Sequence, residues 1–180
     1  MKYLFNIFLL CLACFTFKSC NTATPENYFD QAVLNTNMLV GFAGSGMARE
    51  LESPSVKMEE GTGKAVPMKR KEVVNDRIKY LEESLGKIKD LKETPDTKEM
   101  LQSSLALYEY VLPVYKKEYV QLAALYDEGA DKEKIQSQLQ GINDKYYSKF
   151  NELMDKLINT GKSYAERHSI KVNWGVGGGQ

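Results

Sequence analysis

The feature that most constrains the fold is a run of leucines and tyrosines between residues 101 and 126. Apolar or tyrosine side chains recur there at alternating steps of four and three residues. This spacing places them on one side of an α-helix, as in a coiled-coil seam, and is not that of a β-strand. Because ordering the backbone costs about 1–2 kcal/mol per residue, such a helix needs partner helices. The seam consists of Leu101, Leu105, Tyr108, Leu112, Tyr115, Tyr119, Leu122 and Tyr126.

Three other segments also show the apolar spacing of amphipathic helices. The first predicted helix opens at Thr24-Pro25-Glu26, where a capping threonine precedes a proline and an acid, and runs to about residue 51. The second spans about residues 68–92, and the third, which carries the seam, about 94–129. The fourth opens at the capping residue Asp131 and ends near His168.

Two features of the third helix need separate interpretation. Asp96 and Glu99 have the spacing of a capping box at its start. Pro113 lies in its middle, where it removes one hydrogen bond and clashes with the carbonyl of Glu109. The heptad phase passes through Pro113 unshifted, which favours one kinked helix over two separate helices.

These segments predict an all-α chain whose residues 25–170 form an antiparallel four-helix bundle. Residues 53–67 hold two prolines and two glycines without periodicity, so a long surface loop is expected between the first and second helices. The glycine-rich residues 171–180 are expected to form a flexible tail.

The first nineteen residues predict a signal peptide. Two residues with a lysine precede an apolar run, Tyr3–Phe17, which would span about 22 Å as a helix and is too short for a bilayer core of ~30 Å. Ser19-Cys20 at its end has the form of a lipobox, in which Cys20 carries the lipid. Residues 20–24 would then be the lipidated cysteine and a short linker. Plain secretion, with Cys20 a bystander thiol, and a retained anchor are the alternatives.

The chain resembles uncharacterised helical surface lipoproteins of bacterial envelopes. The resemblance lies in Ser19-Cys20, in Ile78-x-x-Leu81 with Leu85-x-x-Ile88, in the stretches 105–111 and 115–119, and in Tyr164-Ala-Glu-Arg-His168. It implies an acylated Cys20 that becomes the mature N-terminus. The lipid would hold the chain at the membrane. The expected location is the bacterial cell envelope, at the outer membrane, with a protein partner there.

Glycines interrupt the first predicted helix at Gly41, Gly44 and Gly46, where each costs about 1 kcal/mol relative to alanine. Three explanations are open. A neighbouring helix approaches closely, a ligand lies against the exposed backbone, or the helix breaks at residues 44–46.

Eleven tyrosines are the unusual feature of the composition, and four of them lie on the seam. They serve either as large core residues with a hydroxyl at the edge or as the lining of a polar-aromatic ligand pocket. On the second interpretation, the candidate ligand-binding residues are Tyr108, Tyr115, Tyr119, Gly41 and Gly44.

The composition offers little chemistry. The 24 basic and 24 acidic residues give no net charge to attract nucleic acid, and one histidine with three cysteines leaves no zinc pattern. No catalytic residue, metal ligand or cofactor motif is expected, so the chain is not expected to be an enzyme. The expected function is a lipid-anchored envelope protein that acts as a binding or scaffolding module. The alternative is a small-ligand receptor with a tyrosine-lined pocket near the Pro113 kink.

Overall fold

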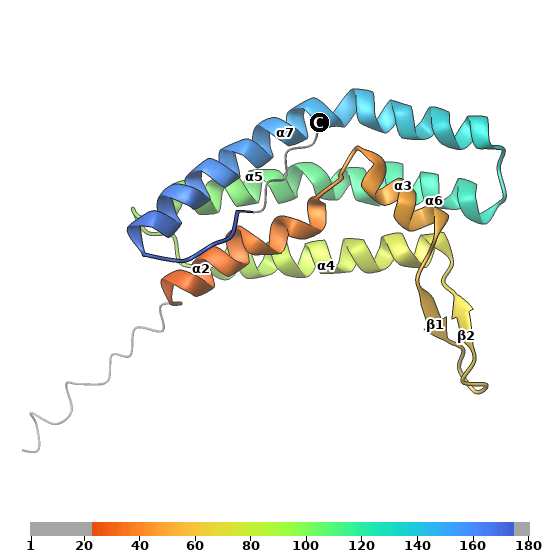
Figure 1. Ribbon diagram of the computed structural model, residues 1–180, viewed down its shortest axis with the longest axis horizontal. Helices are drawn as coiled ribbons and strands as arrows, with labels where there is room; N and C mark the ends of the chain where they lie inside the picture. The colour runs from red at the N-terminus through yellow and green to blue at the C-terminus, as the bar shows by residue number, and fades with distance from the viewer. Residues whose placement is uncertain (1–22, 175–180) are drawn as a thin grey trace, which may run out of the picture.

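Three long helical rods dominate the structure, a computed structural model that describes residues 23–174 (Figure 1). They are α4 (Arg70–Asp90), the continuous run of α5 (Lys98–Val114), η3 (Tyr115–Tyr119) and α6 (Val120–Asp127), and α7 (Lys132–Arg167). Consecutive rods run in opposite directions. Of the described residues 72% are helical, and five helices pack together beside a small two-stranded hairpin. The all-α expectation is thus met for all but this hairpin.

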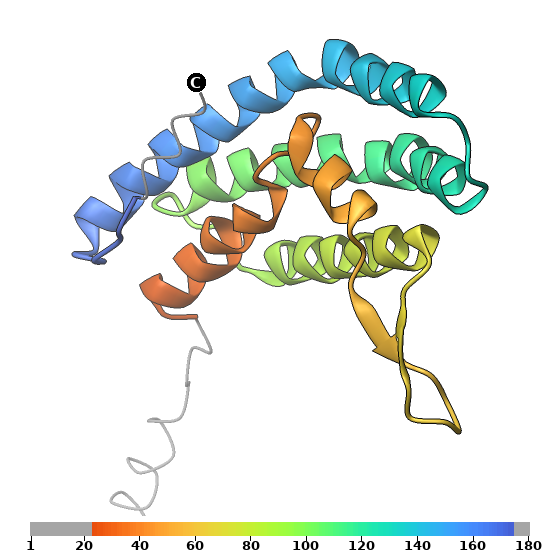
Figure 2. The ribbon, with the colours of Figure 1, turned by 45° about the vertical axis from the view of Figure 1, so that its right-hand side comes forward.

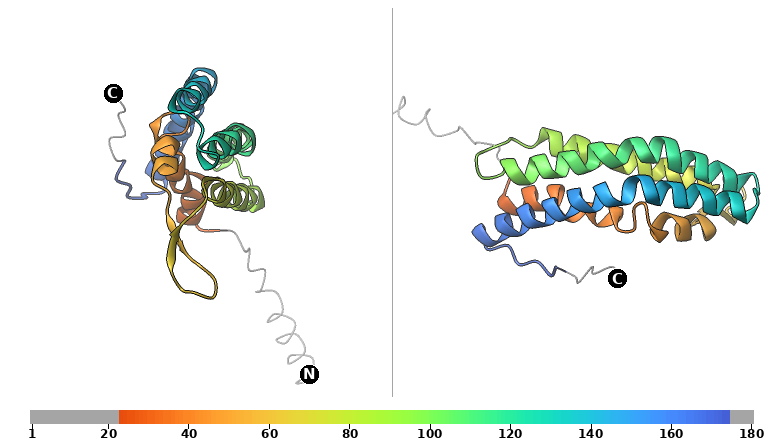
Figure 3. Two further views of the ribbon diagram at one scale, coloured as in Figure 1. Left: turned by 90° about the vertical axis from the view of Figure 1, so that its right-hand side faces the viewer. Right: turned by 90° about the horizontal axis from the view of Figure 1, so that it is seen from above.

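The predicted first helix is wrong as a single element. The segment forms α2 (Pro25–Ala32), the 3₁₀ helix η2 (Leu34–Leu39) and α3 (Ser45–Glu52), which lie end to end alongside α7 (Figure 3). Its start is as predicted, because Thr24 caps α2 by accepting from the Asn27 amide at 3.2 Å. The expected four-helix bundle is therefore a domain of five helices, which are α2, α3, α4, the continuous α5–α6 run and α7.

Local chemistry explains the break. The hydroxyl of Thr36 donates to the carbonyl of Val33 at 2.6 Å, a bond that competes with a regular helix. Gly41 then adopts φ +83° and Ala43 φ +54°, in the left-handed region that ends helices. Of the three explanations for the glycines, a break in the helix is the one that the structure supports, but it lies at residues 40–44 rather than 44–46, because α3 already begins at Ser45.

The long surface loop expected at residues 53–67 is also wrong, because it contains a β-hairpin. Strand β1 (Val56–Met58) pairs antiparallel with β2 (Ala65–Pro67), with Lys57 opposite Val66. Gly61 and Gly63 supply the positive φ values of the turn. The hairpin projects from the helical body (Figure 2).

The seam packs inward as predicted. Leu101, Tyr108, Tyr115, Tyr119 and Leu122 are buried, and the other three seam residues pack partly buried against the same core. Helical conformation continues through Pro113, which is exposed, and Tyr115–Tyr119 then form a π-helical turn. A π turn accommodates a disturbed hydrogen-bond ladder without ending the helix.

The remaining helix ends are set by side-chain caps. Asp131 accepts from the Lys134 amide at 2.8 Å and so starts α7, as predicted. Asp96 does not form the predicted capping box, because α5 starts at Lys98 with Thr97 as its N-cap residue. The Asp96 carboxylate instead pairs with Arg167 at 2.9 Å and with His168 at 2.5 Å, which fastens the end of α7 to the α4–α5 connection.

Candidate functional site

A groove of about 500 Å³ on the described part of the chain has a mainly apolar lining. One wall is η2 with the following loop, the second is the middle of α7, and the third is the chain after α7. No charged side chain is among the described residues that line it. This lining consists of Val33, Leu34, Thr36, Asn37, Val40, Gly41, Phe42, Gly44, Ser45, Tyr147, Phe150, Asn151, Met154, Ile158, Val172, Asn173 and Trp174.

The third wall is formed by residues 170–174, which double back along α7 and which we call the C-terminal strap. The amide of Ile170 donates to the Ala165 carbonyl at 2.9 Å, which closes the turn at the end of α7. At the far end of the strap, the Trp174 ring meets the Phe29 ring of α2 edge-on at 5.7 Å. The strap therefore links α7 to α2 and closes one side of the apolar groove.

The floor of the groove is the loop at residues 40–44. Both backbone groups of Ala43 are bonded, the N–H to the Tyr119 hydroxyl at 2.8 Å and the C=O to the Asn143 amide at 2.8 Å. Gly41 also lies so close to Gly46 that a Cβ on Gly41 would be 2.8 Å from the Gly46 Cα. These contacts fix the shape of the loop.

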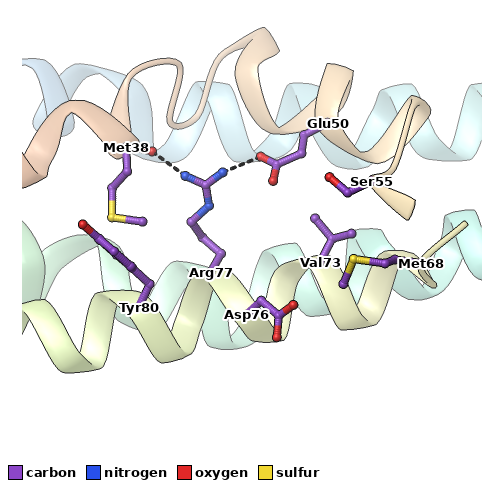
Figure 4. Close-up of a pocket in the computed structure, with 8 residues that line it drawn as sticks. All are labelled: Met38, Glu50, Ser55, Met68, Val73, Asp76, Arg77 and Tyr80. Atoms are coloured by element: carbon purple, nitrogen blue, oxygen red, sulfur yellow. Dashed lines mark hydrogen bonds and ion pairs between the residues drawn. The ribbon is translucent and has the colours of Figure 1, made fainter. Parts of the chain in front are cut away.

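A second, more polar site lies around Arg77 of α4 (Figure 4). Its guanidinium donates to the Met38 carbonyl at 2.9 Å and to the Glu50 carboxylate at 2.7 Å, and so holds η2 and α3 against α4. Two hollows of about 280 and 230 Å³ share Met38, Glu50 and Arg77 as lining residues. The smaller one also reaches Gly41 and Tyr115.

Tyr115 brings an unused hydroxyl to this smaller cavity. Its side chain is 2% exposed, and burial raises its pKa well above the ordinary value. Among the described residues its hydroxyl has no hydrogen-bond partner within bonding geometry, whereas that of Tyr119 accepts from Ala43. The π turn places the two rings side by side, 4.7 Å apart. A phenol in this position can donate to, or accept from, a molecule in the cavity.

The structure distributes the sequence-predicted site residues over several places. Gly41 and Gly44 line the apolar groove, and Gly41 also lines the cavity that Tyr115 reaches. Tyr119 lines neither hollow, but its hydroxyl is bonded to the loop at residues 40–44, which contributes to both. Tyr108 is fully buried and lines neither hollow. Cys20 lies outside the described residues.

Sequence reasoning missed Arg77, Glu50 and Trp174. The spacing of Arg77 placed it on the solvent side of its helix, and nothing in the sequence revealed that Glu50 would face it. Trp174 gave one usable signal, because a single tryptophan in a glycine-rich tail is a strong candidate for packing.

Within residues 23–174, no cluster of three or more His, Cys, Asp or Glu side chains is arranged to bind a metal ion. No helix in this range is both long and apolar enough to cross a bilayer. Comparison of the chain with protein-family models, curated proteins and solved structures finds no match. The geometry of the hollows is therefore what bears on function.

Proposed function

We propose that this chain is a lipid-anchored binding module of the bacterial cell envelope. Cys20 is the anchor, and the apolar groove is the binding surface. The observation that carries the proposal is the groove itself, an uncharged hollow of about 500 Å³ in a chain of which 27% of the residues are charged. Ligand sites in proteins are commonly apolar concavities of 300–1,000 Å³ with a few polar groups at the edge. Binding or scaffolding, rather than catalysis, is the proposed role.

The anchor would hold the domain close to the bilayer. Thr24 already caps α2, so only residues 21–23 separate Cys20 from the helical domain. Four extended residue steps reach about 13–14 Å. A lipidated Cys20 would thus place α2 beside the membrane, and the proposed location is the outer membrane.

The first test is metabolic labelling with an alkyne fatty-acid analogue. We expect the wild-type chain to be labelled and Cys20→Ala to lose the label, since Cys20 follows the apolar leader directly. Cys14→Ala is the matched control and should retain the label, because Cys14 lies inside the leader. Label that persists on Cys20→Ala would refute the anchor.

A second candidate function is a small-ligand receptor at the cavity behind Arg77. The specific observation in its favour is Tyr115, a buried side chain that lines a cavity of about 230 Å³ and whose hydroxyl has no hydrogen-bond partner among the described residues. A polar molecule bound in the cavity would form a hydrogen bond with this hydroxyl. The tyrosine-lined receptor site would thus involve Tyr115 rather than the surface at Pro113.

This candidate is tested by native mass spectrometry of the full chain purified from its own membrane. We expect wild type to carry the additional mass of a small molecule and Tyr115→Phe to lose it, because the variant removes only the hydroxyl. Tyr108→Phe is the control, since its hydroxyl is buried without a partner but lies outside the cavity. A ligand-free mass for wild type, or equal retention by Tyr115→Phe, would contradict the receptor.

A further inference from the structure

We propose that the apolar groove binds the hydrocarbon chain of a fatty acid whose carboxylate lies against Lys162. This inference rests on the proposed role as a binding module, and it does not depend on the anchor at Cys20.

The α7 wall of the groove is a single stripe. Tyr147, Asn151, Met154 and Ile158 follow one another at steps of four, three and four residues, so they lie on one side of the helix. From the first to the last the stripe is about 16 Å long. Leu34 and Val40, both exposed, line the opposite wall. The groove is thus long enough for an extended hydrocarbon chain and offers it apolar contacts on both sides.

Charge distinguishes the two ends of such a ligand. No charged side chain lines the groove, so it favours an uncharged chain and disfavours an ionic group inside it. Lys162 continues the α7 stripe four residues beyond Ile158, and its ammonium lies 5.6 Å from the centroid of the Trp174 ring. It forms no ion pair within the described part of the chain. A cation therefore stands beside an uncharged groove, which is the arrangement that a carboxylate-headed chain requires.

The walls of the groove argue against a helix of a partner protein. The C-terminal strap closes the third side, so a bulky partner could not enter without displacing it. One hydrocarbon chain is thin enough to lie within these three walls.

The chain contains its own reporter, because its single tryptophan is Trp174 in the wall of the groove. Bromine quenches tryptophan emission on contact. The full chain, purified in a mild unbrominated detergent, should lose at least about half of its emission when titrated with dibromostearic acid.

Two variants test whether the hydrocarbon chain of the fatty acid lies in the groove. Ile158→Glu puts a carboxylate into the groove and should weaken the apparent affinity about tenfold or more, because an unpaired charge is excluded from apolar surroundings. Met58→Glu is the matched control, since Met58 is an exposed apolar residue on the distant hairpin. It should titrate as wild type does. Absence of quenching, or equal quenching in Ile158→Glu, overturns the proposal.

A second pair of variants tests the head group. Lys162→Gln should weaken the binding of dibromostearic acid several-fold and leave the binding of dibromostearyl alcohol unchanged, because only the acid carries a charge for Lys162 to neutralise. Lys156→Gln, an exposed lysine off the stripe, should change neither. Equal effects of Lys162→Gln on acid and alcohol overturn the assignment of the carboxylate.

The outcome is separable from that of the anchor. If Cys20 is labelled but no brominated chain quenches Trp174, the fatty-acid site is wrong and the anchor stands. If the quenching occurs but Cys20→Ala keeps its label, the fatty-acid site stands and the anchor is wrong.

Discussion

Replacing Gly41 by alanine should lower the free energy of unfolding by about 2–5 kcal/mol. Gly41 has φ +83°, where an L-residue with a side chain is strained. Its new Cβ would also lie 2.8 Å from the Cα of Gly46 and 3.1 Å from the Gly46 nitrogen. Both are backbone atoms, which cannot rotate away as the end of a side chain can. The loop that forms the floor of the groove would have to open.

The chain offers a matched control for this prediction. Gly61, at the tip of the hairpin, has φ +82°, but a Cβ there would meet nothing within 4 Å. Gly61→Ala should therefore cost only the backbone strain, about 1–2 kcal/mol. Urea denaturation followed by circular dichroism measures both variants. If the two cost the same, the close approach of Gly41 and Gly46 makes no contribution.

Replacing Tyr119 by phenylalanine should cost about 1–3 kcal/mol of stability, because it removes the acceptor for a buried amide. The Tyr119 hydroxyl accepts from the Ala43 N–H at 2.8 Å, and the side chain is 1% exposed. Burial raises the pKa of Tyr119 to about 12, and the Ala43 amide lowers it in part. Without the hydroxyl, the amide of a residue already at φ +54° would have no partner in the core.

Tyr108→Phe is the control, because it removes a hydroxyl from the same helical run at a place where the hydroxyl has no partner. The Tyr108 oxygen is buried and forms no hydrogen bond of good geometry among the described residues; burial raises its pKa to about 12, and the nearby Ser84 hydroxyl lowers it in part. Removing it should change stability by less than about 0.5 kcal/mol or increase it. Chemical denaturation of the two variants should therefore give clearly different midpoints. A Tyr108→Phe loss as large as that of Tyr119→Phe would show that the Ala43 bond is not the cause.

The long helices were predictable because their evidence is local. In α4, Val74, Leu81 and Ile88 recur at seven-residue intervals, and all three are buried. The N-cap at Asp131 was predictable for the same reason, because it depends on a contact with a residue only three positions away. When an apolar pattern extends over several helical turns, each of its residues indicates the same buried side of the helix.

The first helix was predicted as a single element because its apolar spacing survives the break. Phe29, Ala32, Leu39, Met47 and Leu51 all reach the core, although they belong to three separate elements. Spacing reports which side chains are buried, and a turned chain can bury the same ones. The hairpin escaped prediction because each strand has only three residues, too few to show a period of two.

The residues of the candidate sites also divide into those that the sequence predicted and those that it did not. Gly41 and Tyr115 were singled out from composition and spacing, and they line one cavity, 74 positions apart in the chain. The two neighbours that give this cavity its polarity, Glu50 and Arg77, were not found. No pattern within one helix reports which charge a neighbouring helix presents.

By itself, the sequence determined the four helical stretches that fill the core and most of their ends, since these depend on contacts between residues a few positions apart. Only the tertiary structure decided where the first stretch turns, that residues 53–67 pair as strands, and that a tail with one tryptophan closes a groove. These outcomes depend on backbone groups and side chains that meet across long separations, such as Ala43 with Tyr119 and Phe29 with Trp174. These contacts stabilise the fold only once the helices have packed against one another.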